Sequence, residues 1–138
     1  MPDDLGARIA ACAVSNIGVP FRLHGRTPQS GLDCIGLLAD ALSSAGFAET
    51  IPADYGLRGR FDQRAHAFFE TDKFEAVDGA TSRLPGDFAL VAIAPWQLHF
   101  IIYVSGGFVH AHAGLRRVVL TPGNPPWPLL GRWRYIGE

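Results

Sequence analysis

The spacing of apolar residues changes along the chain, from helical in the first half to extended in the second. Residues 3–17 carry apolar side chains three or four positions apart, which predicts a helix that ends at Gly18. A second helix is predicted to begin at Asp33 and to end near Gly46, and its apolar residues surround it almost completely, so most of its sides should be buried. Residues 62–71 resemble a short third helix. The segments between these helices, 21–32 and 48–60, are predicted to be loops.

From Leu84 onward, β-branched and aromatic residues form short runs that are separated by turn residues. The residues Ser105, Gly106 and Gly107 predict a hairpin turn between two of these runs. The predicted strands are 88–93, 99–104, 108–113, 117–120 and 132–136. Helices followed by a meander of strands predict an α+β fold with an antiparallel sheet.

The composition predicts one globular domain that spans residues 1–138. Of the 138 residues, 48% are hydrophobic and 18% are charged, which is typical of a folded domain. The 12 basic and 13 acidic residues nearly balance and form no run, so we expect no nucleic-acid partner and no membrane partner. The longest apolar run, 88–94, is too short to span a bilayer. The start, Met1-Pro2-Asp3-Asp4, lacks the basic-then-apolar order of a signal peptide.

Cys34 is the first candidate for chemistry. The chain has two cysteines, Cys12 and Cys34, and this number predicts free thiols made in a reducing compartment rather than a disulfide scaffold. Cys34 is expected in the first turn of the second helix, where unpaired amides and the helix dipole favour a thiolate. The like charge of Asp33 opposes the thiolate, so a protonated histidine nearby is also needed. Cys12 lies in an apolar stripe and is interpreted as a structural residue.

Three histidines are expected on one face of the predicted hairpin. His99 lies on the first strand, and His110 and His112 alternate on the second. The position of the two-residue turn decides whether His99 is opposite His112 or is shifted by one pair, but the three residues share a face in both registers. This arrangement is typical of a base whose second ring nitrogen is held by another polar group. A three-histidine zinc site is the alternative, and it leaves Cys34 unexplained.

Four blocks of the sequence follow one another in a recognisable order. They are 18–25 (GVPFRLHG) with 31–37 (GLDCIGL), 85–87 (PGD), 99–104 (HFIIYV) and 108–111 (FVHA). In this order they resemble the patterns PY-x-x-GG … DCSGL, PGD, HVGIYLG and FIHA of the NlpC-type cysteine peptidases of bacterial cell walls. The resemblance implies a reduced papain-like fold, in which the helix that carries the nucleophile packs on an antiparallel sheet.

The resemblance also implies a role for each residue of a catalytic trio. Cys34 matches the nucleophile, His99 the base, and His110 the polar residue that orients the base. The resemblance therefore selects His110 over His112, a choice that strand alternation leaves open. The implied chemistry is acyl transfer through a thioester, which needs no metal and no organic cofactor.

The expected substrate-binding residues are Phe21, Arg22, Asp33 and Ile35, which lie in the block around the nucleophile. Phe21 replaces the tyrosine that is common in the family, and Ile35 replaces the serine that follows the nucleophile. Both changes predict a less polar pocket. Asp33 could bind an amine of the substrate or could cap the helix.

Members of the family cleave amide bonds in peptidoglycan stem peptides, often between D-glutamate and the diamino acid. The resemblance thus implies a peptidoglycan peptide as the substrate. The chain resembles compact hydrolases encoded with phage or phage-like tails, which implies tail proteins as partners. We expect synthesis in the cytoplasm and delivery to the cell wall on a phage-like particle. A non-catalytic tail or wall-binding module with the same fold is the alternative from another functional class.

Overall fold

The computed structural model describes residues 4–51, 61–94 and 97–137. The helices are α1 (Leu5–Ser15), α2 (Cys34–Ser44) and α3 (Phe61–Phe69). The strands are β1 (Arg26–Thr27), β2 (Gly31–Leu32), β3 (Phe74–Ala76), β4 (Phe88–Ala94), β5 (Gln97–Val104), β6 (Gly107–His112), β7 (Arg117–Pro122) and β8 (Leu129–Tyr135). Most of the predicted loop 48–60 lies outside the described residues.

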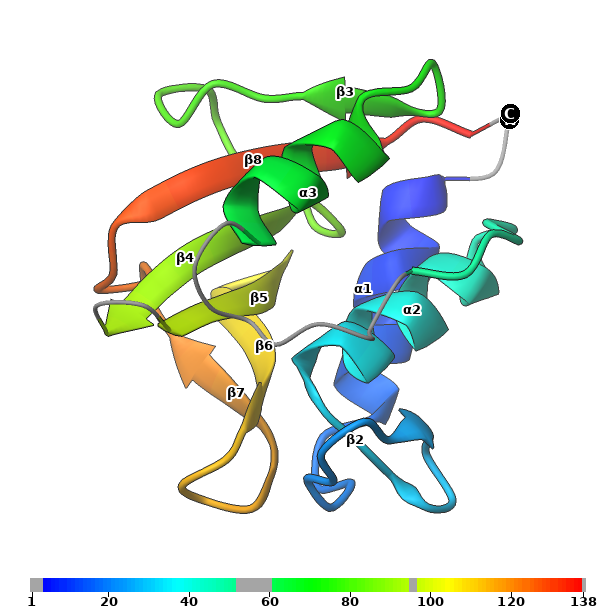
Figure 1. Ribbon diagram of the computed structural model, residues 1–138, viewed down its shortest axis with the longest axis vertical. Helices are drawn as coiled ribbons and strands as arrows, with labels where there is room; N and C mark the ends of the chain where they lie inside the picture. The colour runs from blue at the N-terminus through cyan, green and yellow to red at the C-terminus, as the bar shows by residue number, and fades with distance from the viewer. Residues whose placement is uncertain (1–3, 52–60, 95–96, 138) are drawn as a thin grey trace.

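Six of the strands form one antiparallel sheet in the order β3-β8-β4-β5-β6-β7, and β1 and β2 form a separate hairpin. Buried side chains of α1, α2 and α3 join those of one face of the large sheet in a single core cluster. All three helices therefore cover the same face, with α1 beside α2 (Figure 1). This arrangement confirms the predicted α+β fold.

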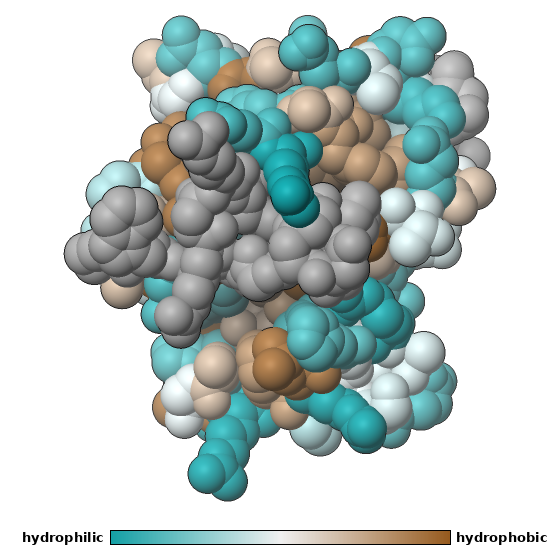
Figure 2. All heavy atoms as spheres, viewed as in Figure 1, coloured by the Kyte–Doolittle hydropathy of each residue, from teal (hydrophilic) through white to brown (hydrophobic). Residues whose placement is uncertain are grey.

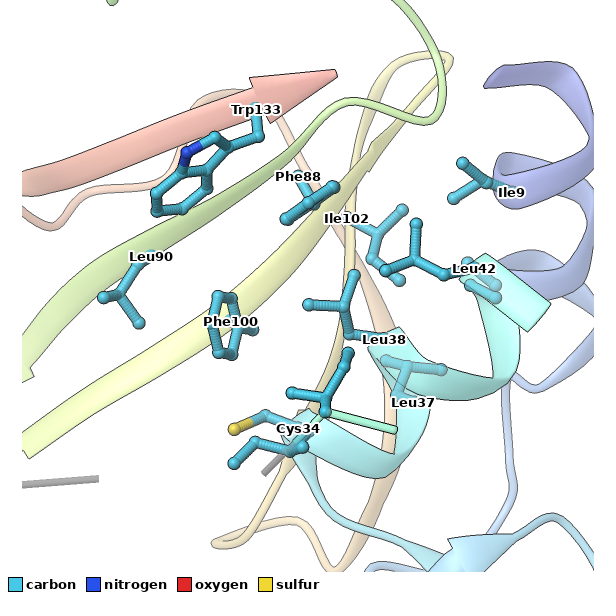
Figure 3. Packing of buried hydrophobic residues seen from close by; sticks show 14 of the residues in the cluster. Ile9, Cys34, Leu37, Leu38, Leu42, Phe88, Leu90, Phe100, Ile102 and Trp133 are labelled. Carbon is cyan, nitrogen blue, oxygen red and sulfur yellow. The ribbon is translucent and has the colours of Figure 1, made fainter. Parts of the chain in front are cut away.

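The core between the helices and the sheet consists of large aliphatic and aromatic side chains. Figure 3 shows Ile9 of α1 and Leu38 and Leu42 of α2 close to Ile102 of β5, with Phe88 of β4 beside it. Each of these side chains is almost fully excluded from solvent, and burial of a side chain of this size stabilises a fold by about 1.5–3 kcal/mol. This packing fixes α2 against β5 and so determines where the first turn of α2 lies.

The opposite face of the sheet is also buried, around a second and smaller cluster. Its members are Ala89, Val91, Ile101, Tyr103 and Phe108. Trp127, from the segment between β7 and β8, packs against this cluster. Strand alternation puts the three histidines of the predicted hairpin on this same face.

The predicted loop 21–32 contains the short strands β1 and β2 and lies directly on the first turn of α2. The close approach depends on Gly36, because a Cβ atom at this position would collide with the carbonyl oxygen of Gly25. Leu32 of this segment is completely buried in the main core cluster. The loop is thus an integral wall beside Cys34.

The face of the molecule seen in Figure 2 is mixed in character. Figure 2 shows apolar side chains in several separate groups among polar ones, which is ordinary for a protein surface. No helix among residues 4–51, 61–94 and 97–137 combines the length and the apolar character that crossing a bilayer requires.

Candidate active site

Asp33 fixes the start of helix α2. It is the N-cap residue, and its Oδ1 accepts hydrogen bonds from the backbone N–H of Gly36 and from Nη1 of Arg26, both at 2.8 Å. Its Oδ2 accepts from the backbone N–H of His24, also at 2.8 Å. Asp33 is 6% exposed, so these bonds form largely away from water, where they are strongest. They tie the preceding loop to the helix and place Cys34 as the first helical residue.

The side chain of Cys34 projects from the start of α2 on the side where Phe100 of β5 lies (Figure 3). The residue is only 3% exposed. The backbone N–H of Phe100 donates to the thiol sulfur. The nucleophile candidate is therefore held between a helix start and a strand edge.

Strands β5 and β6 separate beside Cys34. The turn lies at Ser105-Gly106, and the residue pairs run from Val104↔Gly107 only as far as Ile102↔Val109. Beyond the last pair, side chains from both faces of the two strands enter one cleft, including Leu98 and His99 of β5 and three successive residues of β6, 110–112. Because the strands separate, the sulfur of Cys34, on the core side of the sheet, and the imidazoles of His99 and His110, on the other side, line the same cleft.

His99 and His110 are bonded to each other rather than to His112. The Nε2 atom of His99 lies 2.9 Å from Nδ1 of His110, and Nε2 of His110 lies 3.1 Å from Oγ1 of Thr121. His112 instead accepts a hydrogen bond from the backbone N–H of Leu115 at its Nδ1 atom, at 3.1 Å. Since Nε2 of His99 is occupied by His110, Nδ1 is the ring nitrogen left to exchange a proton with a nucleophile.

A cleft of about 470 Å³ contains Cys34, His99 and His110 together. Much of its wall is apolar, with contributions from Phe21, Ile35 and Trp127. The indole of Trp127 lies edge-on to both imidazoles, with centroid distances of 6.3 Å to His99 and 5.8 Å to His110. The cleft is thus large enough for part of a peptide and shields the histidines from water on one side.

Burial keeps both Cys34 and His99 neutral at pH 7. It raises the pKa of the Cys34 thiol to about 12, and the charge of Asp33 acts in the same direction, whereas the N–H of Phe100 lowers the pKa. Burial also lowers the pKa of His99 to about 3, with further lowering by the other histidines of the cleft. The prediction that the helix start gives Cys34 a lowered pKa is therefore wrong, because loss of hydration outweighs the helix dipole.

A neutral pair requires general-base catalysis rather than a resting ion pair. No hydrogen bond joins Cys34 Sγ to His99 within the part of the chain that the structure describes. In active sites without bound substrate, the nucleophile and its base commonly lie farther apart than a hydrogen bond, which forms when substrate binds.

Two of the four expected substrate-binding residues, Phe21 and Ile35, contribute apolar surface to the cleft. Asp33 also borders it, but its carboxylate is engaged in capping α2. Arg22 is exposed and is absent from the described lining.

Trp127 and Thr121 were not predicted as site residues. Trp127 lies in a proline-rich segment without periodicity, which gives no signal for its position. Thr121 lies just beyond the predicted strand 117–120, whereas β7 continues to Pro122. Extension of the alternation by one residue would have placed Thr121 on the histidine face.

The described residues contain no group of three or more His, Cys, Asp or Glu side chains arranged to hold a metal ion. His99 and His110 direct ring nitrogens at each other, and His112 uses Nδ1 for a backbone N–H. The geometry therefore gives no support to the three-histidine zinc alternative.

Comparisons with known proteins identify the fold. No protein-family model and no curated protein matches the sequence. Among solved structures, NlpC1 from Trichomonas vaginalis superimposes with a TM-score of 0.70 at 22% identity over 98% of this chain, which spans about half, 46%, of that protein. The peptidoglycan hydrolase RipB from Mycobacterium tuberculosis gives 0.62 at 21% identity, over 97% of this chain and 65% of RipB.

A third similar structure is RipD from Mycobacterium tuberculosis, a non-catalytic NlpC/p60 domain protein adapted to peptidoglycan binding. It has a TM-score of 0.61 at 18% identity, over 97% of this chain and 98% of RipD. Identities this low establish the fold and leave the activity to be tested. The chain has the papain-like α+β fold of NlpC/p60 domain proteins.

Proposed function

We propose that this protein is an NlpC-type cysteine peptidase that hydrolyses an amide bond in peptidoglycan stem peptides. The observation that carries the proposal is the assembly of Cys34, His99 and His110 in one cleft, with the two imidazoles bonded at 2.9 Å. A thiol, a base and a group that orients the base are the parts that nucleophilic acyl transfer requires.

The reaction begins when Cys34 attacks the carbonyl carbon of the substrate amide. Nδ1 of His99 takes the thiol proton as the S–C bond forms, and the imidazolium then gives this proton to the leaving amine as the C–N bond breaks. Water activated by His99 hydrolyses the resulting thioester and restores the thiol. The backbone N–H of Cys34, at the start of α2, can donate to the oxyanion. His110 holds the ring plane and the tautomer of His99.

Peptidoglycan is supported as the ligand by the similar proteins, since RipB is a peptidoglycan hydrolase and RipD is adapted to peptidoglycan binding. Cleavage between D-glutamate and the diamino acid, and delivery by a phage-like particle with tail proteins as partners, stay predictions. The apolar cleft walls at Phe21 and Ile35 favour contact with aliphatic parts of the stem peptide.

A non-catalytic peptidoglycan-binding domain is the second candidate, because the thiol is buried and protonated and because RipD has this fold without activity. Incubation with purified muropeptides, followed by mass analysis, separates the two candidates. The peptidase yields shorter peptides that disappear with Cys34→Ala, whereas a binding domain retains the muropeptide intact. Muropeptides that remain intact after incubation with the wild type, as with Cys34→Ala, would contradict the proposed activity.

A further inference from the structure

A threonine hydroxyl lies at the end of the histidine chain, on the side away from Cys34. Thr121 belongs to β7, where it pairs with Phe108, while His110 pairs with Val119. Thr121 is therefore a diagonal neighbour of His110 on the same sheet face, and its Oγ1 lies 3.1 Å from Nε2 of His110. The neighbouring Leu120 points to the other side of the strand and is 45% exposed.

The chain of hydrogen bonds allows two orders of its protons. In the first, Nε2–H of His110 donates to Thr121, so Nδ1 of His110 accepts from Nε2–H of His99, and Nδ1 of His99 is free of a proton. In the second, Thr121 donates to His110 and every bond reverses, so Nδ1 of His99 carries a proton. Only the first order leaves a base that can accept the thiol proton of Cys34.

We propose that Thr121 is a positioning residue, whose hydroxyl accepts the Nε2–H proton of His110 and thereby keeps Nδ1 of His99 unprotonated. This inference deepens the proposed function and rests on it for its catalytic consequence. The proton order itself is a property of the folded protein and can be measured without substrate. Burial lowers the pKa of His110 to about 4, so the ring is neutral at pH 7 and has a defined tautomer.

The direct test is the tautomer of His110, read from the ring ¹⁵N signals of the 138-residue chain by NMR at pH 7. We expect the Nε2–H tautomer in the wild type and in Thr121→Ser, which retains the hydroxyl. Thr121→Val has nearly the same shape but no acceptor, and we expect a mixture of tautomers. An Nδ1–H tautomer in the wild type, or an unchanged Nε2–H tautomer in Thr121→Val, would overturn the inference.

Turnover of muropeptides gives the catalytic readout. We expect Thr121→Val to lower kcat about tenfold with KM nearly unchanged, equivalent to about 1.4 kcal/mol, because the effect acts on the base and not on substrate contacts. Thr121→Ser should recover most of the loss, and Leu120→Ala, on the other side of the same strand, should match the wild type. A rise in KM alone, or the same loss with Ser, would contradict a positioning role. If no variant is active, the proposed function fails while the NMR result still decides the proton order.

Discussion

Replacement of His110 by alanine should abolish nearly all turnover while the protein remains folded. His110 is 3% exposed, and its Nδ1 atom lies within hydrogen-bond distance of Nε2 of His99, at 2.9 Å. Its removal leaves the ring of His99 without the partner that fixes its plane and its tautomer. His112→Ala is the matched control, because His112 lies on the same strand face but bonds to the backbone at Leu115.

The size of the effect follows from these contacts. A base that loses its orienting partner typically loses about 10³- to 10⁴-fold in kcat, so we expect a loss of about 10³-fold for His110→Ala. The imidazole also packs edge-on or tilted against Phe108 and Trp127, at centroid distances of 5.0 Å and 5.8 Å. We expect loss of this packing and of two hydrogen bonds to reduce the free energy of unfolding by about 2 kcal/mol. His112→Ala should lower turnover by no more than about tenfold.

The assay is single-turnover and steady-state hydrolysis of muropeptides, with circular dichroism and urea unfolding as folding controls. His110→Gln and His110→Asn should each retain part of the activity, because the side-chain amide can still accept a hydrogen bond from the imidazole. If His112→Ala were the inactive variant and His110→Ala turned over normally, the assignment of His110 would be refuted.

Three further predictions concern the thiols, the helix cap and metal. Burial raises the pKa of Cys34 to about 12 and that of Cys12 to about 11, so iodoacetamide should label both thiols far more slowly at pH 7–9 in the folded protein than in urea. Labelling of the folded protein should rise only at more alkaline pH, and rapid labelling of Cys34 at pH 7 would instead show a resting thiolate. Asp33→Ala should reduce the free energy of unfolding, measured by urea titration, by about 3 kcal/mol, because its cap bonds are buried. Asp4→Ala, which removes an exposed helix cap, should reduce it by about 1 kcal/mol, and equal reductions for the two variants would contradict the role of the buried bonds. Elemental analysis should find no stoichiometric zinc, and chelators should leave turnover intact, whereas one tightly bound zinc per chain would favour a metal site.

The periodicity of the sequence predicted the elements because burial imposes it. The apolar positions of α2 surround the helix, and the helix is in fact buried on most sides. The alternation of His99 with Ile101 and of His110 with Phe108 correctly predicted a common sheet face. The turn at Ser105-Gly106 was one of the two registers that the sequence left open, since either glycine-containing pair can form it.

Long-range geometry could not be predicted in the same way. Continued pairing from the observed turn would place His99 opposite His112, but β5 and β6 separate after Ile102↔Val109, and His99 meets His110 instead. The raised pKa of Cys34 likewise depends on how deeply the packing of α2 against β5 buries the thiol. A helix start suggests a thiolate, whereas the tertiary contacts decide the thiol's hydration.

The most direct test of cysteine-dependent hydrolysis is the mass spectrum of purified muropeptides after incubation with the wild-type protein and with Cys34→Ala. We expect only the wild type to release products, whose summed mass exceeds that of the muropeptide by one water per bond cleaved, as in hydrolysis of an amide. Trapping at low pH should reveal an acyl adduct on the peptide that contains Cys34. Intact muropeptides with the wild type, or the same products with Cys34→Ala, would contradict cysteine-dependent hydrolysis.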